Sequence, residues 1–124
     1  MLLASSPAEL LLSIAAAGPQ ISLDAVTKPL VSSLLNQSQC WLKLKAWEPA
    51  EQSCSAVLEI EPQSAKALYR RGLARIETHF YDEAKEDLKQ ACALEPKSKE
   101  IRDAFARAKH QHEILRYNWL HSTA

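Results

Sequence analysis

The chain has 124 residues, with 15 basic and 15 acidic side chains and 47% hydrophobic residues. This apolar content argues against a disordered chain, and the balanced charge gives no general preference for nucleic acid or an anionic membrane. Only two glycines occur and straight-chain helix formers are abundant, so we expect an all-α fold.

The first 20 residues favour a short helix. Ser6 would be its N-cap, Pro7 its first residue and Glu9 the acid of a capping box, and Gly18-Pro19 would end it. The apolar run that ends in three alanines also resembles a signal-peptidase site, but no basic residue precedes it and Glu9 interrupts it. No run approaches the ~20 apolar residues of a membrane span, so we expect no membrane partner.

Ser22 or Asp24 can cap a following helix, which Pro29 should kink or restart because proline removes a hydrogen bond and clashes with the preceding turn. The apolar periodicity after Pro29 predicts more helices. We expect them at 30–44, 49–60, 65–78, 81–94 and 98–120.

Residues 31–64 and 65–98 superimpose at an offset of 34, the period of a helix-turn-helix repeat. The matched pairs are Leu34 and Leu68, Ser38 and Gly72, Leu42 and Ile76, Trp47 and Tyr81, Ala50 and Ala84, Ile60 and Leu94, and Glu61-Pro62 and Glu95-Pro96. Small residues at the second and fifth pairs would let the two helices of a unit approach closely. Pro62 and Pro96 would end each unit, and Ser64 and Ser98 can cap the next helix.

These matches resemble the tetratricopeptide repeat (TPR) family. The amino-acid sequence from Val31 to about Phe105 is similar to that of the last two repeats of FKBP-type immunophilins and related co-chaperones. The resemblance implies a helical solenoid with repeats at 31–64 and 65–98, and a capping helix and tail at 99–124. The segment 1–30 would then be a helical remnant of a first repeat or a substitute for one.

The capping helix is also predicted by its own sequence. Positions spaced by three or four residues are apolar or nearly so, which places them on one helix face that can cover the last repeat. They are Ile101, Phe105, Ala108, His112, Leu115 and Trp119.

Lys66 and Arg70 are four residues apart and share a helix face with no acid at i±4. In the co-chaperones that the chain resembles, Lys, Arg and Asn at the second and sixth positions of a repeat form a carboxylate clamp for the acidic C-terminal tail of heat-shock chaperones. The resemblance assigns Asn36, Lys66 and Arg70 to that clamp. A solvated basic face without a ligand is the alternative for Lys66 and Arg70, and a helix–helix hydrogen bond is the alternative for Asn36.

Five further positions are expected to face the groove, with Tyr69 and Leu73 receiving an apolar side chain of the peptide and Lys43 enlarging the basic patch. The groove-facing residues are Leu35, Gln39, Lys43, Tyr69 and Leu73. Arg71 falls at a seventh position, so we expect it to point toward the helix behind and to be structural.

One departure from the family pattern affects the clamp. The family takes a further Lys and Asn from a preceding repeat, whereas residues 1–30 contain one lysine, Lys28, and no asparagine. The clamp is therefore partial, or the first repeat was lost, or another chain or copy completes the groove.

The sequence indicates no cofactor, metal site or catalytic centre. Cys40, Cys54 and Cys92 are odd in number and lie in apolar helical patterns, so we interpret them as reduced core residues of a cytoplasmic protein. His110 and His112 point to different helix faces, and no phosphate loop or nucleophile–base pair occurs. Trp41, Trp47 and Trp119 are assigned to packing, since no basic stripe surrounds them for nucleic acid.

The sequence thus predicts a protein-interaction module that binds chaperone tails. The first alternative is a scaffold that self-associates, as a homodimer, or binds another protein through its exposed helical flank, because two repeats leave more apolar surface open than the usual three. The second is an enzyme, which would require this chain to be part of a longer one with an isomerase domain.

Overall fold

The computed structural model describes residues 7–9 and 22–122, and in these ranges the regular structure is helical throughout. The helices are α2 (Leu23–Lys43), α3 (Trp47–Ile60), α4 (Ala65–Glu77), α5 (Tyr81–Leu94) and α6 (Lys99–Ser122). The all-α prediction is confirmed. Residues 7–9 are helical, as the first capping box predicts, but the rest of that expected helix lies outside the described residues.

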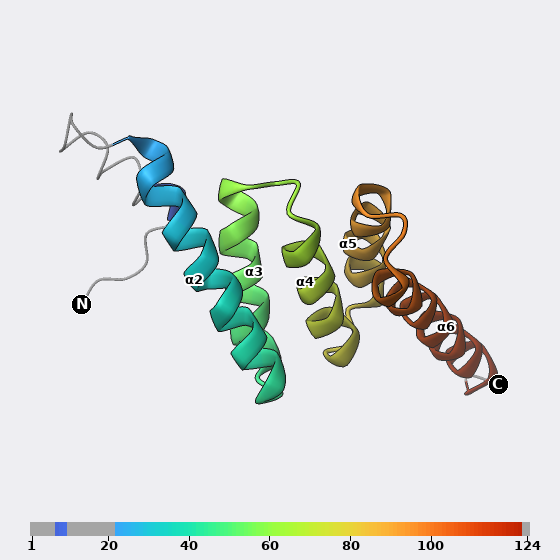
Figure 1. Cartoon of the computed structure of the whole chain (residues 1–124). Helices are drawn as coiled ribbons and strands as arrows, with labels where there is room; N and C mark the ends of the chain where they lie inside the picture. The colour runs from blue at the N-terminus through green and yellow to red at the C-terminus, as the bar shows by residue number, and fades with distance from the viewer. Residues whose placement is uncertain (1–6, 10–21, 123–124) are drawn as a thin grey trace.

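Successive helices pack against one another along the chain, which produces an open stack (Figure 1). In addition, α4 contacts both α2 and α6, so these three helices form one layer. Helices α3 and α5 lie behind them. This arrangement confirms the predicted solenoid and makes α4 the centre of the face on which the basic residues were expected.

Serine side chains begin three of the helices. The Ala25 amide donates to Ser22 Oγ at 3.1 Å, and the Ala67 and Ile101 amides donate to the hydroxyl oxygens of Ser64 (3.2 Å) and Ser98 (3.3 Å). Each bond satisfies one of the free amides at a helix start. The three caps agree with the sequence prediction.

Pro29 does not restart a helix, which was one of the two outcomes expected for it. It lies inside α2, which runs unbroken from Leu23 to Lys43. Proline removes a single backbone hydrogen bond near the start of this helix, and Pro29 and Ala25 are both exposed, so water can solvate the carbonyl that loses its donor. Packing along the rest of α2 is sufficient to keep the helix continuous.

The two helix-to-helix turns within the repeats have the same geometry. Lys45 and His79, which are 34 residues apart, have positive φ angles of 59° and 68°. The next residue in each turn donates its amide to a carbonyl five residues back, Ala46 to Trp41 and Phe80 to Arg75, both at 2.8 Å. This pattern ends a helix by a left-handed residue, although neither position holds the glycine that such turns favour.

The small residues matched between the repeats lie at close approaches. A Cβ atom built on Gly72 would lie 2.6 Å from Leu88 Cγ on α5. Ser38, Ala50 and Ala84 are fully buried. Their sizes therefore set the distance between helices within each unit, as the sequence predicts.

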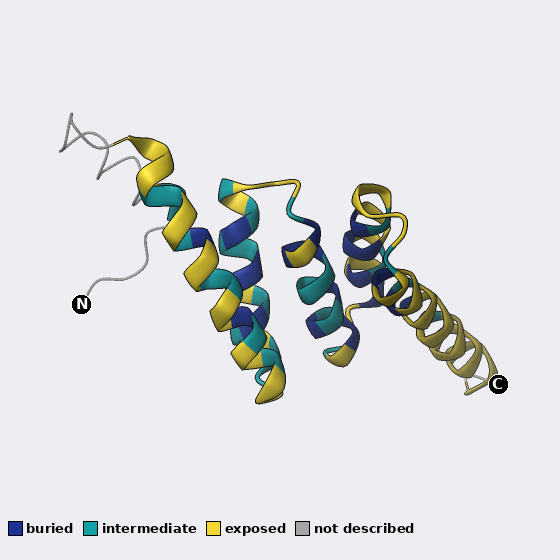
Figure 2. Ribbon diagram, viewed as in Figure 1, coloured by how far each residue is buried: buried dark blue, intermediate teal, exposed yellow. Residues whose placement is uncertain are grey.

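Helix α6 covers the last repeat with only its first half. Ile101 and Ala108 are buried and Phe105 is half-buried, but Leu115 and Trp119 are 50% and 64% exposed (Figure 2). The expectation that the whole apolar face is covered was therefore wrong at these two positions. The reason is length, because α6 has 24 residues and α5 only 14, so the last turns of α6 extend beyond their partner.

Two other packing expectations also need correction. Cys54 is buried and Cys92 half-buried, but Cys40 is exposed, and all three are free thiols. Trp41 is exposed as well. Both residues lie in the last turn of α2.

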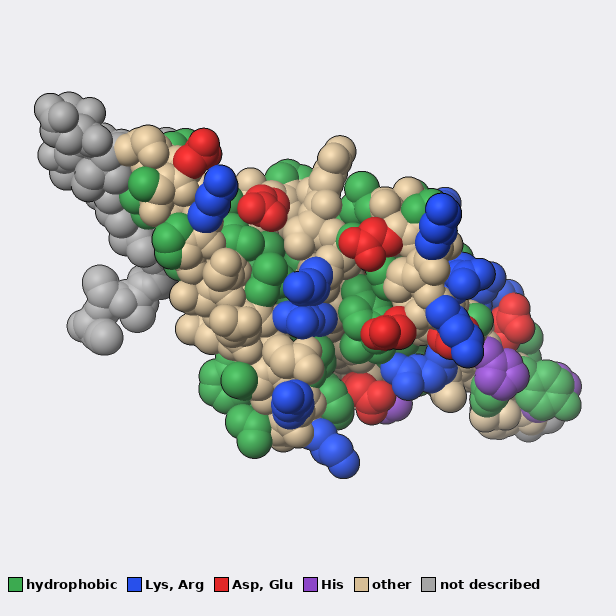
Figure 3. Space-filling view, in the orientation of Figure 1, with side chains coloured by type: hydrophobic (Ala, Val, Ile, Leu, Met, Phe, Trp, Pro, Cys, Tyr) green, Lys and Arg blue, Asp and Glu red, His purple; other side chains and the backbone are tan. Residues whose placement is uncertain are grey.

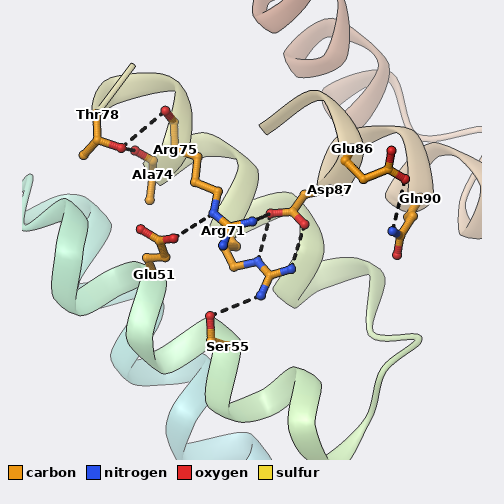
Figure 4. A network of polar contacts seen from close by, with 9 residues as sticks. All are labelled: Glu51, Ser55, Arg71, Ala74, Arg75, Thr78, Glu86, Asp87 and Gln90. Carbon is orange, nitrogen blue, oxygen red and sulfur yellow. Dashed lines mark hydrogen bonds and ion pairs between the residues drawn. The ribbon is translucent and has the colours of Figure 1, made fainter. Parts of the chain in front are cut away.

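Arg71 is structural, as expected. It forms a two-pronged contact with the buried carboxylate of Asp87, at 2.8 and 2.7 Å, and also donates to Ser55 (Figure 4). Arg75 donates to the same carboxylate at 2.9 Å and to Glu51 at 2.7 Å. This network joins α3, α4 and α5 across the boundary between the two repeats.

Candidate peptide-binding groove

A hollow of about 580 Å³ lies on the face formed by α2, α4 and α6. Its lining residues come from all three helices and from the turn that precedes α6. They are Gln39, Leu42, Lys43, Lys66, Tyr69, Arg70, Leu73, Glu95, Ser98, Glu100 and Ile101. Figure 3 shows this side of the molecule, with Lys and Arg side chains near its middle and acidic side chains beside them.

The two basic residues of α4 have different surroundings. Lys66 is exposed, whereas Arg70 is half-buried and uses Nη1 to donate to the Leu35 carbonyl at 2.7 Å and to Ser38 Oγ at 3.3 Å. These bonds to α2 fix the position of the guanidinium group. A fixed cation loses less side-chain freedom when a ligand binds.

The positive charges of the groove have no acidic partner within the part of the chain that the structure describes. Lys43, Lys66 and Arg70 form no ion pair there, whereas the neighbouring Arg71 and Arg75 are both paired with carboxylates. The five basic residues thus form two groups: Arg71 and Arg75 have a structural role on the rear side of α4, and the other three line the groove.

Tyr69 and Leu73 supply the apolar part of α4 in the groove. Both are half-buried and pack against the core cluster that contains Ile76 and Leu88. Burial raises the pKa of the Tyr69 hydroxyl, and the negative charge of Glu100 raises it further. Tyr69 is therefore a neutral hydrogen-bond donor at physiological pH.

Two of the residues assigned from the sequence do not line the hollow. Leu35 is half-buried and packs with Val31, Cys54 and Val57, so it contributes its carbonyl to Arg70 and not its side chain to the groove. Asn36 is exposed on α2 but is not among the lining residues. The other six, Gln39, Lys43, Lys66, Tyr69, Arg70 and Leu73, share one hollow.

The sequence analysis missed the acidic lining residues. Extending the 34-residue period by one unit would have pointed to Glu100, which is the counterpart of Lys66. Glu95 was matched to Glu61 without a role in the groove. Ile101 was recognised only as a core position. The groove therefore continues onto the capping helix.

Other kinds of site find little support in the described part of the chain. No three His, Cys, Asp or Glu side chains in residues 7–9 and 22–122 gather as a metal ion would require. Burial raises the pKa of the Cys54 thiol to about 11, which opposes formation of a reactive thiolate. None of the helices in these ranges is both long and apolar enough to cross a bilayer.

The repeat architecture is supported by comparison with known proteins. The model of the tetratricopeptide repeat family matches residues 65–98. The helices of this chain form a TPR domain. The TPR fold is a protein-interaction module. The range matched by the family model, 65–98, is the range predicted for the second repeat of this chain.

Curated relatives of this TPR domain include FK506-binding proteins. The chain is 39% identical over 79 residues to rat FK506-binding protein-like, which covers 64% of this chain and 23% of the relative. It is 34% identical over 76 residues to mouse peptidyl-prolyl cis-trans isomerase FKBP4, which covers 61% of this chain and 17% of the relative. The chain therefore spans about a quarter or less of the length of these relatives.

Solved TPR domains have the same architecture. The C-terminal TPR-containing domain of a Plasmodium falciparum FK506-binding protein superimposes with a TM-score of 0.77, at 33% identity over 81% of this chain and 66% of that one. The first TPR of Spaghetti (RPAP3) bound to the HSP90 peptide SRMEEVD gives 0.65 at 25% identity, over 69% of each chain. The second TPR domain of human RPAP3 in complex with the HSP70 peptide SGPTIEEVD gives 0.61 at 29% identity, over 64% and 66%.

Proposed function

We propose that this TPR domain binds the acidic C-terminal tail of a cytoplasmic heat-shock chaperone in the groove between α2, α4 and α6. The observation that carries the proposal is a set of basic side chains, Lys43, Lys66 and Arg70, that line one hollow without an acidic partner in the described structure. Two similar TPR domains were solved with acidic chaperone peptides, which supports this ligand class.

Each residue has a chemical role in the proposal. Arg70 presents the free edge of a guanidinium that α2 holds in place, and Lys66 supplies a mobile ammonium one helical turn away. Charge-assisted hydrogen bonds from two such donors suit a chain terminus that bears both an α-carboxylate and an acidic side chain. Asn36, exposed on the neighbouring helix, would add a neutral donor to a peptide that extends past the hollow.

The deciding experiment is a titration with a fluorescent peptide ending in Met-Glu-Glu-Val-Asp, beside the same peptide amidated at its C-terminus. We expect binding that is lost on amidation. Lys66→Ala should weaken binding by about 1–3 kcal/mol, the range for hydrogen bonds to charged groups. Lys89→Ala, which removes an exposed lysine of α5 outside the groove, is the matched control. Equal binding by wild type and Lys66→Ala would contradict the clamp.

A second candidate function is that of a scaffold that self-associates or binds another protein through its flanks. The observation in its favour is apolar exposure at both ends of the stack, with Leu44 71% exposed on one side and Trp119 64% exposed on the other. Sedimentation velocity over a concentration series tests self-association. A strictly monomeric species would rule out the homodimer.

A further inference from the structure

The groove carries charges of both signs. Glu95 and Glu100 line the same hollow as Lys66 and Arg70, yet these four side chains form no ion pair with one another in the structure described. Glu100 also lines an adjoining hollow between α4 and α6, together with Tyr69. The acidic side chains are therefore available to a ligand that already contacts the basic ones.

The repeat register explains how the two signs are separated. The second positions of successive front-layer helices are Ser32 on α2, Lys66 on α4 and Glu100 on α6. Because equivalent positions face the same groove, its charge changes from basic to acidic between α4 and α6. A peptide lying across these two helices would meet both.

Helix stability accounts for only one of the two acids. Glu100 lies in the first turn of α6, where a negative charge interacts favourably with the helix dipole. Glu95, however, is the C-cap of α5, where a negative charge is unfavourable. Neither carboxylate makes an ion pair within the described residues, so the negative charge of Glu95 is not compensated there. A positively charged group of a ligand would compensate it.

We propose that Glu95 and Glu100 bind a basic side chain that precedes the acidic end of the bound peptide. This inference rests on the proposed tail-binding function and extends it to specificity. It favours a tail such as SRMEEVD, which has an arginine, over SGPTIEEVD, which has no basic residue.

The peptide is long enough to reach both sets of charges. In SRMEEVD the arginine stands five residues before the C-terminal aspartate. Five residues of extended chain span about 16 Å, and packed helices lie about 8–10 Å apart. With the terminal carboxylates held by Lys66 and Arg70 on α4, the peptide can therefore cross from α4 to α6 and bring its arginine to the acidic side chains.

The test compares SRMEEVD with SAMEEVD, in which the arginine is replaced, by fluorescence anisotropy at low ionic strength. Wild type should bind SRMEEVD about threefold to fivefold more tightly, the upper part of the range expected for exposed ion pairs. The Glu95→Gln/Glu100→Gln double variant should bind the two peptides equally. Glu83→Gln, which removes an acid from the first turn of α5 outside the groove, should keep the wild-type preference.

The outcomes separate the two proposals. Equal binding of the two peptides by wild type, or a preference that survives in the double variant, would overturn the acidic specificity site and leave tail binding intact. If neither peptide binds, both proposals fail. A preference that shrinks in 0.5 M salt, as expected for exposed charges, would support the ion-pair origin, whereas a salt-independent preference would refute it.

Discussion

The contact between Gly72 and Leu88 provides a quantitative test of the packing. Replacing Gly72 by alanine adds one methyl group to the middle of α4. A Cβ atom there would lie 2.6 Å from Leu88 Cγ and 2.9 Å from Cδ2. Leu88 is fully buried and the nearest atom is its branch point, so the side chain cannot rotate away without disturbing its neighbours.

Two effects oppose each other in Gly72→Ala. Alanine favours the helix by about 1 kcal/mol relative to glycine. Overpacking a buried site costs about 1–3 kcal/mol. At a contact this short we expect the second to dominate, with a net loss of about 1 kcal/mol in the free energy of unfolding and about 4 °C in Tm.

Urea unfolding followed by circular dichroism at 222 nm measures this change, with an unchanged m-value as the check on two-state behaviour. The control is the same substitution in a Leu88→Ala background, where the clash is absent and Gly72→Ala should stabilise by about 1 kcal/mol. Trimethylamine N-oxide in all samples would keep the weaker variants folded. Stabilisation of the wild-type background by the full helix-propensity term would refute the close approach.

Three further predictions concern the core. Asp87→Ala should lower the free energy of unfolding by about 3 kcal/mol, because it leaves Arg71 and Arg75 without their buried partner, and chemical denaturation measures this loss. Burial raises the pKa of Cys54 from 9.0 to about 11, so the neutral thiol contributes fully to the free energy of unfolding below pH 9. About 3 kcal/mol of that free energy is lost as pH rises through 11. Chemical denaturation between pH 8 and 11 should therefore show that the free energy of unfolding falls less steeply with pH in Cys54→Ala than in wild type. Ser64→Ala should cost about 1 kcal/mol by removing the α4 cap, and thermal unfolding against Ser122→Ala as control measures it.

Local sequence determined most of the architecture. The period of 34 predicts the order of the helices and their pairing, and Ser64 and Ser98 mark the starts of α4 and α6. Gly72 predicts the close approach of α4 and α5. These signals are readable because each depends on backbone requirements that act over a few residues: a cap, a turn or the absence of a side chain.

The groove was only half predictable. Lys66 and Arg70 share a helix face, so their placement follows from their spacing of four. Glu95 and Glu100 were missed because they belong to a turn and to the capping helix. The repeat register points to Glu100, but the packing of α6 against α4 decides that both line the same hollow. Leu35 and Asn36 do not line the hollow, because which side chains of α2 face it depends on the packing of α2 against α3 and α4.

The sequence by itself determined that this chain is a helical repeat with basic residues on one face of a central helix. The sequence also predicted that Arg71 points away from the groove, but only the tertiary structure decided the partners of the arginines. Arg71 and Arg75 meet Asp87 only when α4 packs against α5, while Arg70 is held by the α2 backbone. Adjacent arginines on one helix point in directions about 100° apart, so their partners come from different neighbouring helices. Partners of that kind are set by packing between segments distant in sequence.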